Sequence, residues 1–182
     1  GQIQGFFDIP VDNLFATPIF ARHAKKKIKS KNLICVAPDV GGTERARALG
    51  KILNVGLAIV DKRRPKPGQS QVMNIIGDVR GKTCIVVDDI IDSGGTIVNA
   101  AKILKQRGAR DVHVYVSHGV LSGDAVEKIR KSQIKNLVIT DTIDNSQKVK
   151  KAKNIEILTI SNLVGEAIKR ISNSTSVSDL FN

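Results

Sequence analysis

The stretch TCIVVDDIIDSGGT, residues 83–96, constrains the fold more than any other part of this chain. It opens with apolar and β-prone residues at 83–87, a short run typical of a strand buried on both faces of a parallel sheet. Two aspartates are expected to end that strand. The apolar spacing after Thr96 predicts a helix whose N-cap is Thr96. The sequence therefore predicts a strand, an acidic turn and a helix N-terminus in direct succession.

The residues of this turn also predict what it could bind. Gly94 and Gly95 permit positive φ or close backbone approach, and the free N–H groups of a helix N-terminus attract a phosphate. Because acids would repel a phosphate, Asp88, Asp89 and Asp92 are expected to face sugar hydroxyls or a magnesium ion. Hydroxyls and a terminal phosphate together describe a ribose phosphate. The alternative is an ordinary turn with an acidic cap, but three aspartates and Gly-Gly-Thr exceed what capping needs.

Two further segments repeat or complement this pattern. APDVGGTERA, residues 37–46, again gives a strand end, an acid, a glycine pair, a hydroxyl cap and a helix, so Gly41 and Gly42 could bind a second phosphate group. The basic loop 61–71 begins where a predicted strand ends, which is the edge where α/β sheets bind ligands. Its cations would more often be a solvated surface run, but a mobile basic loop could also close over phosphates.

The order of apolar runs and turn signals predicts an α/β fold. Short strands alternate with helical patterns, which indicates a largely parallel central sheet with helices on both faces. Strands are expected at residues 33–37, 56–60, 72–76, 83–87, 112–116, 137–140 and 155–160. Helices are expected from a cap at Asp12 and Asn13 to about residue 28, at 44–53, after residue 96, at 124–131 and at 162–171.

Length and composition restrict the class of protein. The 182 residues are expected to form one domain, with a flexible tail at 172–182. The net charge of +12 could suit nucleic acid, but aromatic residues are only 3% and no nucleic-acid-binding motif is present, so neither nucleic acid nor membrane is expected as a partner. Cys35 and Cys84 lie in predicted strands and are typical of a reducing cytoplasm. His23 and His113 are interpreted as structural, whereas His118 could line a nucleotide region.

Several long motifs carry a family resemblance. The segment VVDDIIDSGGT resembles the ribose-5-phosphate and PRPP loop shared by type I phosphoribosyltransferases and PRPP synthetases. Together with QIQGFFDIPVDNL, APDVGGTERA, VDKRRPKP, VMNIIGDVRGKT and VSHGVLSG, it resembles class I ribose-phosphate diphosphokinase, over nearly the whole chain. The resemblance implies a type I phosphoribosyltransferase-like fold. It also implies transfer of the diphosphoryl group of ATP to the 1-hydroxyl of ribose 5-phosphate.

The resemblance assigns roles to individual residues. Lys62 and Arg64 match catalytic residues, Gly41 and Gly42 match a diphosphate loop, and Asp39 matches a ligand of Mg²⁺. The matching ribose-5-phosphate site consists of Asp88, Asp89, Asp92, Ser93, Gly94, Gly95 and Thr96. The family also implies a hexamer built from dimers.

The resemblance covers the second of two similar domains, so this chain is expected to be the C-terminal half of a longer parent and inactive alone. A second metal ligand, a histidine, is expected upstream of Gly1, and no adenine pocket is evident from the sequence. Two alternatives stay open. A non-enzymatic regulatory subunit associated with the synthetase would share the fold but depart from the catalytic motifs. A type I phosphoribosyltransferase would share the central motif but carry a base-recognition hood.

Overall fold

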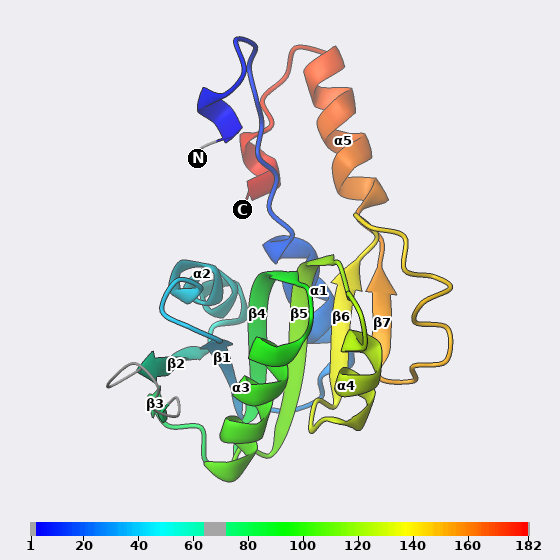
Figure 1. Ribbon diagram of the computed structural model, residues 1–182. Helices are drawn as coiled ribbons and strands as arrows, with labels where there is room; N and C mark the ends of the chain where they lie inside the picture. The colour runs from blue at the N-terminus through cyan, green and yellow to red at the C-terminus, as the bar shows by residue number, and fades with distance from the viewer. Residues whose placement is uncertain (1–2, 64–71, 182) are drawn as a thin grey trace.

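The computed structural model describes residues 3–63 and 72–181, and these form a three-layer α/β domain (Figure 1). In the described residues, one seven-stranded sheet has the order β3-β2-β1-β4-β5-β6-β7. The strands are β1 Leu33–Ala37, β2 Gly56–Arg63, β3 Val72–Ile76, β4 Thr83–Ile91, β5 Asp111–Gly119, β6 Asn136–Thr140 and β7 Ile155–Leu158. The helices are α1 Thr17–Lys27, α2 Thr43–Leu53, α3 Gly95–Gln106, α4 Ala125–Lys131 and α5 Ser161–Ser172, with short 3-10 turns η1 Ile3–Gly5 and η2 Ser178–Phe181.

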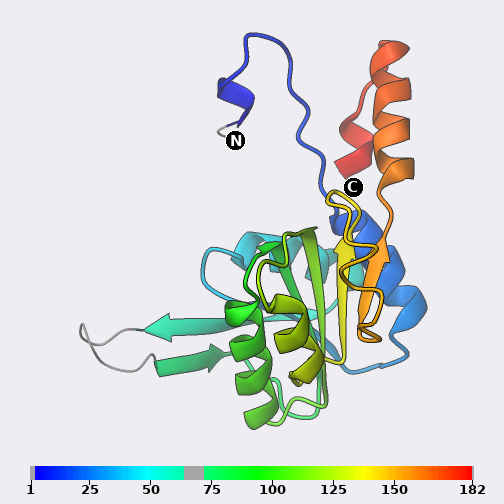
Figure 2. The same cartoon turned by 45° about the vertical axis from the view of Figure 1, so that its right-hand side comes forward.

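Two apolar cores separate the helices from the sheet. Side chains of α1 and α2 pack on one face and those of α3 and α4 on the other (Figures 1 and 2). Alternate residues of β4 divide between these cores: Val86 faces α3, whereas Ile85 and Val87 face α1 and α2. The predicted α/β class, with a largely parallel sheet and helices on both faces, is therefore confirmed. None of the described helices has the length and apolarity that a membrane-spanning segment needs.

Strand β4 differs from the prediction at its carboxyl end. It does not stop before the aspartates but continues to Ile91, because β5 is equally long and pairs with it as far as Ile91 and Gly119. Asp88 and Asp89 are thus strand residues, held at fixed positions by the sheet.

Three predicted helix caps are also wrong. Helix α1 begins at Thr17, with Ala16 as N-cap and a proline in its first turn, rather than at Asp12 and Asn13. Glycines precede the other two helices: Gly42 is the N-cap of α2 and Gly94 that of α3, so Thr43 and Thr96 lie inside the helices that they were expected to cap.

The second strand runs further than expected and forms a hairpin with the third. Strand β2 continues to Arg63 and pairs antiparallel with β3, the exception in a sheet whose other described pairs are parallel. The hairpin projects from the edge of the sheet (Figure 2). The backbone of Lys62 consequently lies in a strand, opposite Met73, and not in the loop. The predicted catalytic residue Arg64 lies outside the described residues.

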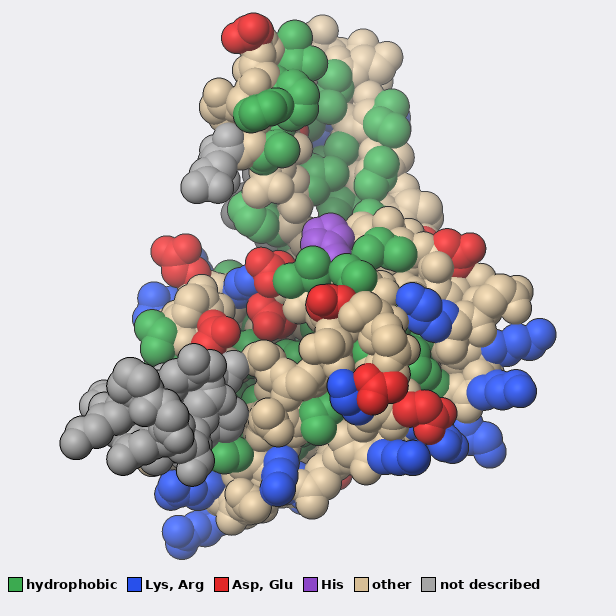
Figure 3. Space-filling model, in the orientation of Figure 1, with side chains coloured by type: hydrophobic (Ala, Val, Ile, Leu, Met, Phe, Trp, Pro, Cys, Tyr) green, Lys and Arg blue, Asp and Glu red, His purple; other side chains and the backbone are tan. Residues whose placement is uncertain are grey.

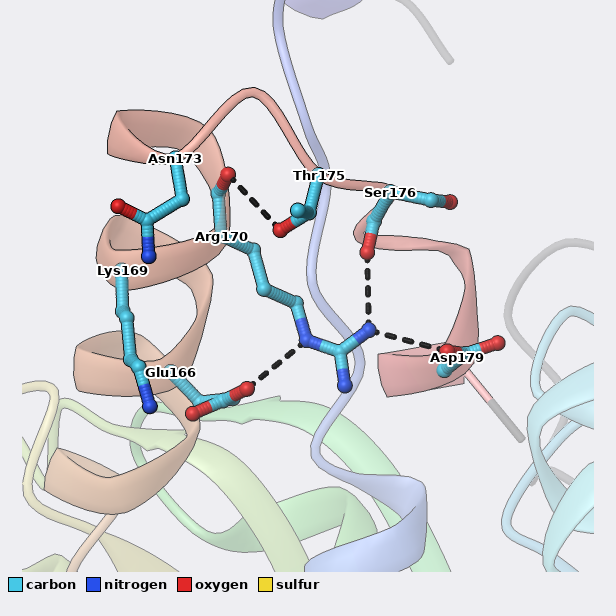
Figure 4. Close-up of a pocket in the computed structure, with 7 residues that line it drawn as sticks. All are labelled: Glu166, Lys169, Arg170, Asn173, Thr175, Ser176 and Asp179. Carbon is cyan, nitrogen blue, oxygen red and sulfur yellow. Dashed lines mark hydrogen bonds and ion pairs between the residues drawn. The ribbon is translucent and has the colours of Figure 1, made fainter.

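The two ends of the chain extend beyond the sheet. Residues 3–16 and α5 both project past the carboxyl ends of β6 and β7 (Figures 1 and 2). After α5 the chain turns back, and Arg170 donates hydrogen bonds to Glu166, to the backbone oxygen of Ser176 and to Asp179 (Figure 4). These contacts do not measure motion, so the flexibility expected for residues 172–182 stays a prediction.

A buried polar network joins α1 to the sheet. The His23 Nδ1 atom lies 3.0 Å from the hydroxyl of Tyr115, and Nε2 lies 3.2 Å from Oε1 of Glu156, which also pairs with Lys27. Tyr115 is only 1% exposed, and its ring packs against Phe20. His23 itself is buried between these partners, which supports its interpretation as a structural residue.

We expect Tyr115→Phe to lower the free energy of unfolding by about 1–2 kcal/mol, because a buried ring nitrogen of His23 loses its partner while the aromatic packing is kept. Urea denaturation of both proteins measures the difference. Equal midpoints with equal slopes would contradict a structural role for this hydrogen bond.

Candidate functional site

The residues predicted to bind phosphate groups, ribose hydroxyls and magnesium meet at one place because of the order of the strands. Strands β1 and β4 are parallel neighbours, although α2, β2 and β3 separate them along the chain. The helix after β1 covers one face of the sheet and the helix after β4 covers the other. Such a switch point opens a crevice at the carboxyl ends of the strands, where α/β proteins bind ligands.

A cleft of about 500 Å³ occupies this switch point. It brings together the predicted acid Asp39, the glycine pair Gly41–Gly42 and the whole acidic turn after β4. Its lining consists of Asp39, Gly41, Gly42, Arg45, Asp88, Asp89, Ile90, Ile91, Asp92, Ser93, Gly94, Gly95, Thr96 and Ile97. On the face drawn in Figure 3, acidic side chains gather at this end of the sheet, whereas Lys and Arg lie mostly along the opposite edge.

The turn after β4 has the backbone geometry of an anion site. Gly94 adopts φ 77°, in the left-handed region, and α3 begins with the next residue. The first N–H groups of a helix have no intrahelical acceptor, and those of α3 adjoin the cleft at Gly95, Thr96 and Ile97. A Cβ at Gly95 would find its nearest neighbour, the Ser93 hydroxyl, at 3.9 Å, so the protein leaves space beside this residue.

Arg45, a residue that the sequence analysis missed, holds the two carboxylates of β4. Its Nη2 atom lies 2.7 Å from Oδ2 of Asp89 and 3.4 Å from Oδ1 of Asp88. The arginine comes from the first turn of α2, three residues after the Gly42 N-cap. Its position inside the APDVGGTERA motif was visible in the sequence, but no residue spacing indicated that it would contact aspartates so far along the chain.

The two aspartates have different electrostatic surroundings. Burial raises the pKa of Asp88 to about 6, and the hydrogen bond donated by the Asp89 backbone N–H and the charge of Arg45 only partly offset this effect. Burial alone would also raise the pKa of Asp89, but the hydrogen bond and charge of Arg45 outweigh it, so this pKa lies below its usual value. Asp89 is therefore ionised at neutral pH, whereas Asp88 titrates at about pH 6.

The raised pKa of Asp88 predicts a pH dependence of stability. Between the ordinary value of 3.8 and about 6, the folded state binds a proton that the unfolded state has released, so stability falls as pH rises through this window. Asp88→Asn removes this titration. We expect the free energy of unfolding of this variant, relative to that of the unsubstituted protein, to increase by about 1–2 kcal/mol from about pH 4 to about pH 7. Solvent screening makes this change smaller than the free energy that corresponds to the whole pKa shift.

Urea denaturation of both proteins across this pH range measures the difference. Parallel profiles of unfolding free energy against pH for the two proteins would contradict a raised pKa of Asp88 in the folded state.

Two hydrogen bonds within residues 39–43 fix the backbone of the Asp39 loop. Oδ1 of Asp39 accepts a hydrogen bond of 3.0 Å from the Gly42 N–H, and the Thr43 hydroxyl donates to the Val40 carbonyl at 2.6 Å. In the described ranges, His, Cys, Asp and Glu side chains form no group of three or more that could hold a metal. Asp39 supplies hard carboxylate oxygens, which suit Mg²⁺, an ion that keeps several of its waters. The donor chemistry therefore fits magnesium bound by few protein ligands.

A second, larger cleft of about 960 Å³ adjoins the first. Leu14, Phe15 and Phe20 line it from the N-terminal segment and α1, and Ser117 and His118 line it from the end of β5. The His118 Nδ1 atom lies 3.0 Å from the Thr142 hydroxyl. The sequence analysis singled out only His118 as a residue that could line such a region. It did not indicate the other walls, because they come from separate segments that only the fold assembles.

Comparisons with known proteins show the family of this chain. The profile of the phosphoribosyl synthetase-associated domain family matches residues 61–182. Curated ribose-phosphate pyrophosphokinases from Hyphomonas neptunium and Agrobacterium fabrum are 59% and 57% identical to this chain. Both alignments cover all of this chain but 58% of the relative, so the chain spans less than two thirds of the length of these relatives.

Solved structures extend the comparison to the fold. The crystal structure of phosphoribosylpyrophosphate synthetase from Mycobacterium smegmatis superposes with a TM-score of 0.86 at 32% identity, covering 95% of this chain and 56% of that one. A purine phosphoribosyltransferase from Pyrococcus horikoshii Ot3 gives a TM-score of 0.50 at 19% identity, covering 80% of this chain and 85% of that one. The second likeness concerns the fold alone.

Proposed function

This chain belongs to the phosphoribosyl synthetase-associated domain family, and on that premise we propose that it is the ribose-5-phosphate-binding domain of a ribose-phosphate diphosphokinase. The observation that supports the proposal is the cleft at the β1/β4 switch point. It combines two glycine-containing helix N-termini, each suited to a phosphate, with carboxylates suited to sugar hydroxyls. A site that holds ribose 5-phosphate while it receives a diphosphoryl group requires both helix N-termini and the carboxylates together.

In the proposed reaction, the 1-hydroxyl of ribose 5-phosphate attacks the β-phosphorus of ATP. The bond from that phosphorus to the oxygen bridging the α-phosphate breaks and the hydroxyl proton is released to solvent, giving PRPP and AMP. The N–H groups of α3 hold the 5-phosphate, Asp88 and Asp89 orient the ribose hydroxyls, and Gly41 and Gly42 receive the diphosphate. Positioning and charge stabilisation supply the catalysis, so a covalent nucleophile is unnecessary.

Cations complete the proposed site. Lys62 and Arg64 neutralise the charge that develops on the diphosphate during transfer. The parallel pairing of β1 and β2 carries the Lys62 backbone toward the edge of the sheet where Asp39 lies. Asp39 would contribute to holding Mg²⁺, which when bound neutralises phosphate oxygens.

Assembly and location belong to the same proposal. The parent self-associates as a hexamer built from dimers and works in the cytoplasm. Cys35 and Cys84 are free and buried in adjacent strands, and burial raises the pKa of both thiols to about 12, which suits unreactive core residues in a reducing compartment.

We expect residues 1–182 alone to bind ribose 5-phosphate but to form no AMP. The phosphate turn and its carboxylates are one contiguous strand–turn–helix unit, so their geometry is local. In-line transfer also needs ATP held in register, and lost positioning can cost several orders of magnitude. Calorimetric titration with ribose 5-phosphate, and AMP release with ATP and Mg²⁺, are the two measurements.

The full-length parent assayed in parallel separates the alternatives. A diphosphokinase forms AMP from ATP and ribose 5-phosphate, an associated regulatory subunit does not, and a phosphoribosyltransferase consumes PRPP and a base. Turnover by residues 1–182 alone, or a failure of this chain to bind ribose 5-phosphate, would contradict the proposed division of roles.

A further inference from the structure

Arg45 occupies the boundary between the two clefts. Together with Gly41 and Asp89 it lines both the 500 Å³ cleft and the 960 Å³ cleft. The ion pair between Arg45 and Asp89, at 2.7 Å, therefore separates the two spaces. A ligand that extends from the ribose turn into the larger cleft would have to pass this pair.

The same pair competes with the proposed ligands. Oxygens of Asp88 and Asp89 that contact Arg45 are the groups proposed to accept hydrogen bonds from ribose hydroxyls or to approach a cation. The side chain of Arg45 is 28% exposed and that of Asp89 is 61% exposed, and ion pairs at such exposure contribute little net free energy. Arg45 can therefore leave Asp89 for another partner at little cost in free energy.

The loop proposed to receive the diphosphate, a second possible partner of Arg45, adjoins the same turn of α2. Arg45 is three residues from the Gly42 N-cap, next to the loop proposed to receive the diphosphate. Guanidinium groups bind phosphate oxygens through bidentate, charge-assisted hydrogen bonds, with the same planar fork that binds carboxylates, so a diphosphate is a suitable alternative partner for Arg45.

We propose that Arg45 is an exchangeable counter-ion that pairs either with Asp88 and Asp89 or with the diphosphate, and that ligand binding transfers it from the first partners to the second. The inference rests on the proposed function for the identity of the ligands. Departure of the arginine would free the carboxylates and open the boundary between the clefts. Arg45 would thus couple occupation of the anion loop to occupation of the acidic edge.

Binding of a cation and of an anion should change in opposite directions when Arg45 is removed. In Arg45→Ala, Mn²⁺ should bind at least about threefold more tightly, because its competitor at the carboxylates is gone. Inorganic pyrophosphate, titrated without divalent cations, should bind about tenfold more weakly. Electron paramagnetic resonance of free Mn²⁺ and calorimetry with pyrophosphate measure the two effects on residues 1–182.

Arg47→Ala is the matched control, since it removes the same charge from an exposed position on the same helix. It should leave both affinities within about twofold. Arg45→Lys, which keeps the charge but not the planar fork, should restore Mn²⁺ binding to the unsubstituted level and pyrophosphate binding only in part.

The inference is overturned if Arg45→Ala weakens both ligands, leaves both unchanged or matches Arg47→Ala. Failure of the unsubstituted chain to bind pyrophosphate would overturn it too. A parallel titration with ribose 5-phosphate reports on the proposed function separately, so failure of that function and failure of the arginine exchange give different patterns.

Discussion

Lys62→Ala in the full-length parent is expected to lower turnover by about a hundredfold or more, while the affinity for ribose 5-phosphate changes little. The lysine is assigned a role in the transition state, where one positioned cation commonly contributes about 3 kcal/mol or more. Its backbone is fixed by pairing with Met73 in the β2–β3 hairpin, so the substitution should not alter the strand. Arg64→Ala should behave in the same way.

Initial rates of AMP formation and calorimetric titration with ribose 5-phosphate distinguish transition-state from ground-state effects. Lys102→Ala is the control, because it removes a lysine from an exposed position on α3. We expect this control to keep full turnover. Unchanged turnover in both Lys62→Ala and Arg64→Ala would remove the catalytic assignment from this segment.

Gly95→Val is expected to weaken binding of ribose 5-phosphate by at least about tenfold without a large loss of stability. Outside the adjoining residues and the backbone of α3, a Cβ at this position would have its nearest neighbour, the Ser93 hydroxyl, at 3.9 Å. The valine would therefore extend into the cleft and block approach of phosphate to the N–H groups of α3. Loss of two charge-assisted hydrogen bonds at about 1.5–3 kcal/mol each accounts for such an effect. Asp92→Asn, at the acidic edge of the same turn, should weaken binding less.

The control for the valine is Gly165→Val in α5, where an added Cβ also meets open space but lies outside both clefts. It should bind ribose 5-phosphate normally, and thermal unfolding of both variants should resemble that of the unsubstituted chain. Normal binding by Gly95→Val would place the phosphate elsewhere.

Local signals in the sequence predicted most elements and much of the candidate site. The apolar run at 83–87 identified a strand buried on both faces, and the spacing of Ile97, Ala100, Ala101 and Leu104 identified the buried face of α3. The chemistry of the central motif was also readable, because glycine, carboxylate and hydroxyl groups limit what a turn can bind. These inferences succeeded since each depends on residues that are neighbours in the chain.

Exact boundaries depended on neighbours in space. Strand β4 continues through its aspartates because β5 pairs with it to Ile91, and the caps of α2 and α3 are glycines because the turns before them fix the backbone. Propensity favoured threonine caps, but the geometry of the turns outweighed that weak preference.

The sequence by itself determined that this chain forms an α/β domain with two glycine-containing turns and an acidic edge. Only the tertiary structure decided that β1 and β4 are neighbours, which brings the Asp39 loop and the Asp88–Asp89 pair into one cleft. It also placed Arg45 on those carboxylates and assembled the second cleft from distant segments. The reason is physical: strand order and long-range ion pairs depend on how the sheet packs as a whole, and no local spacing records them.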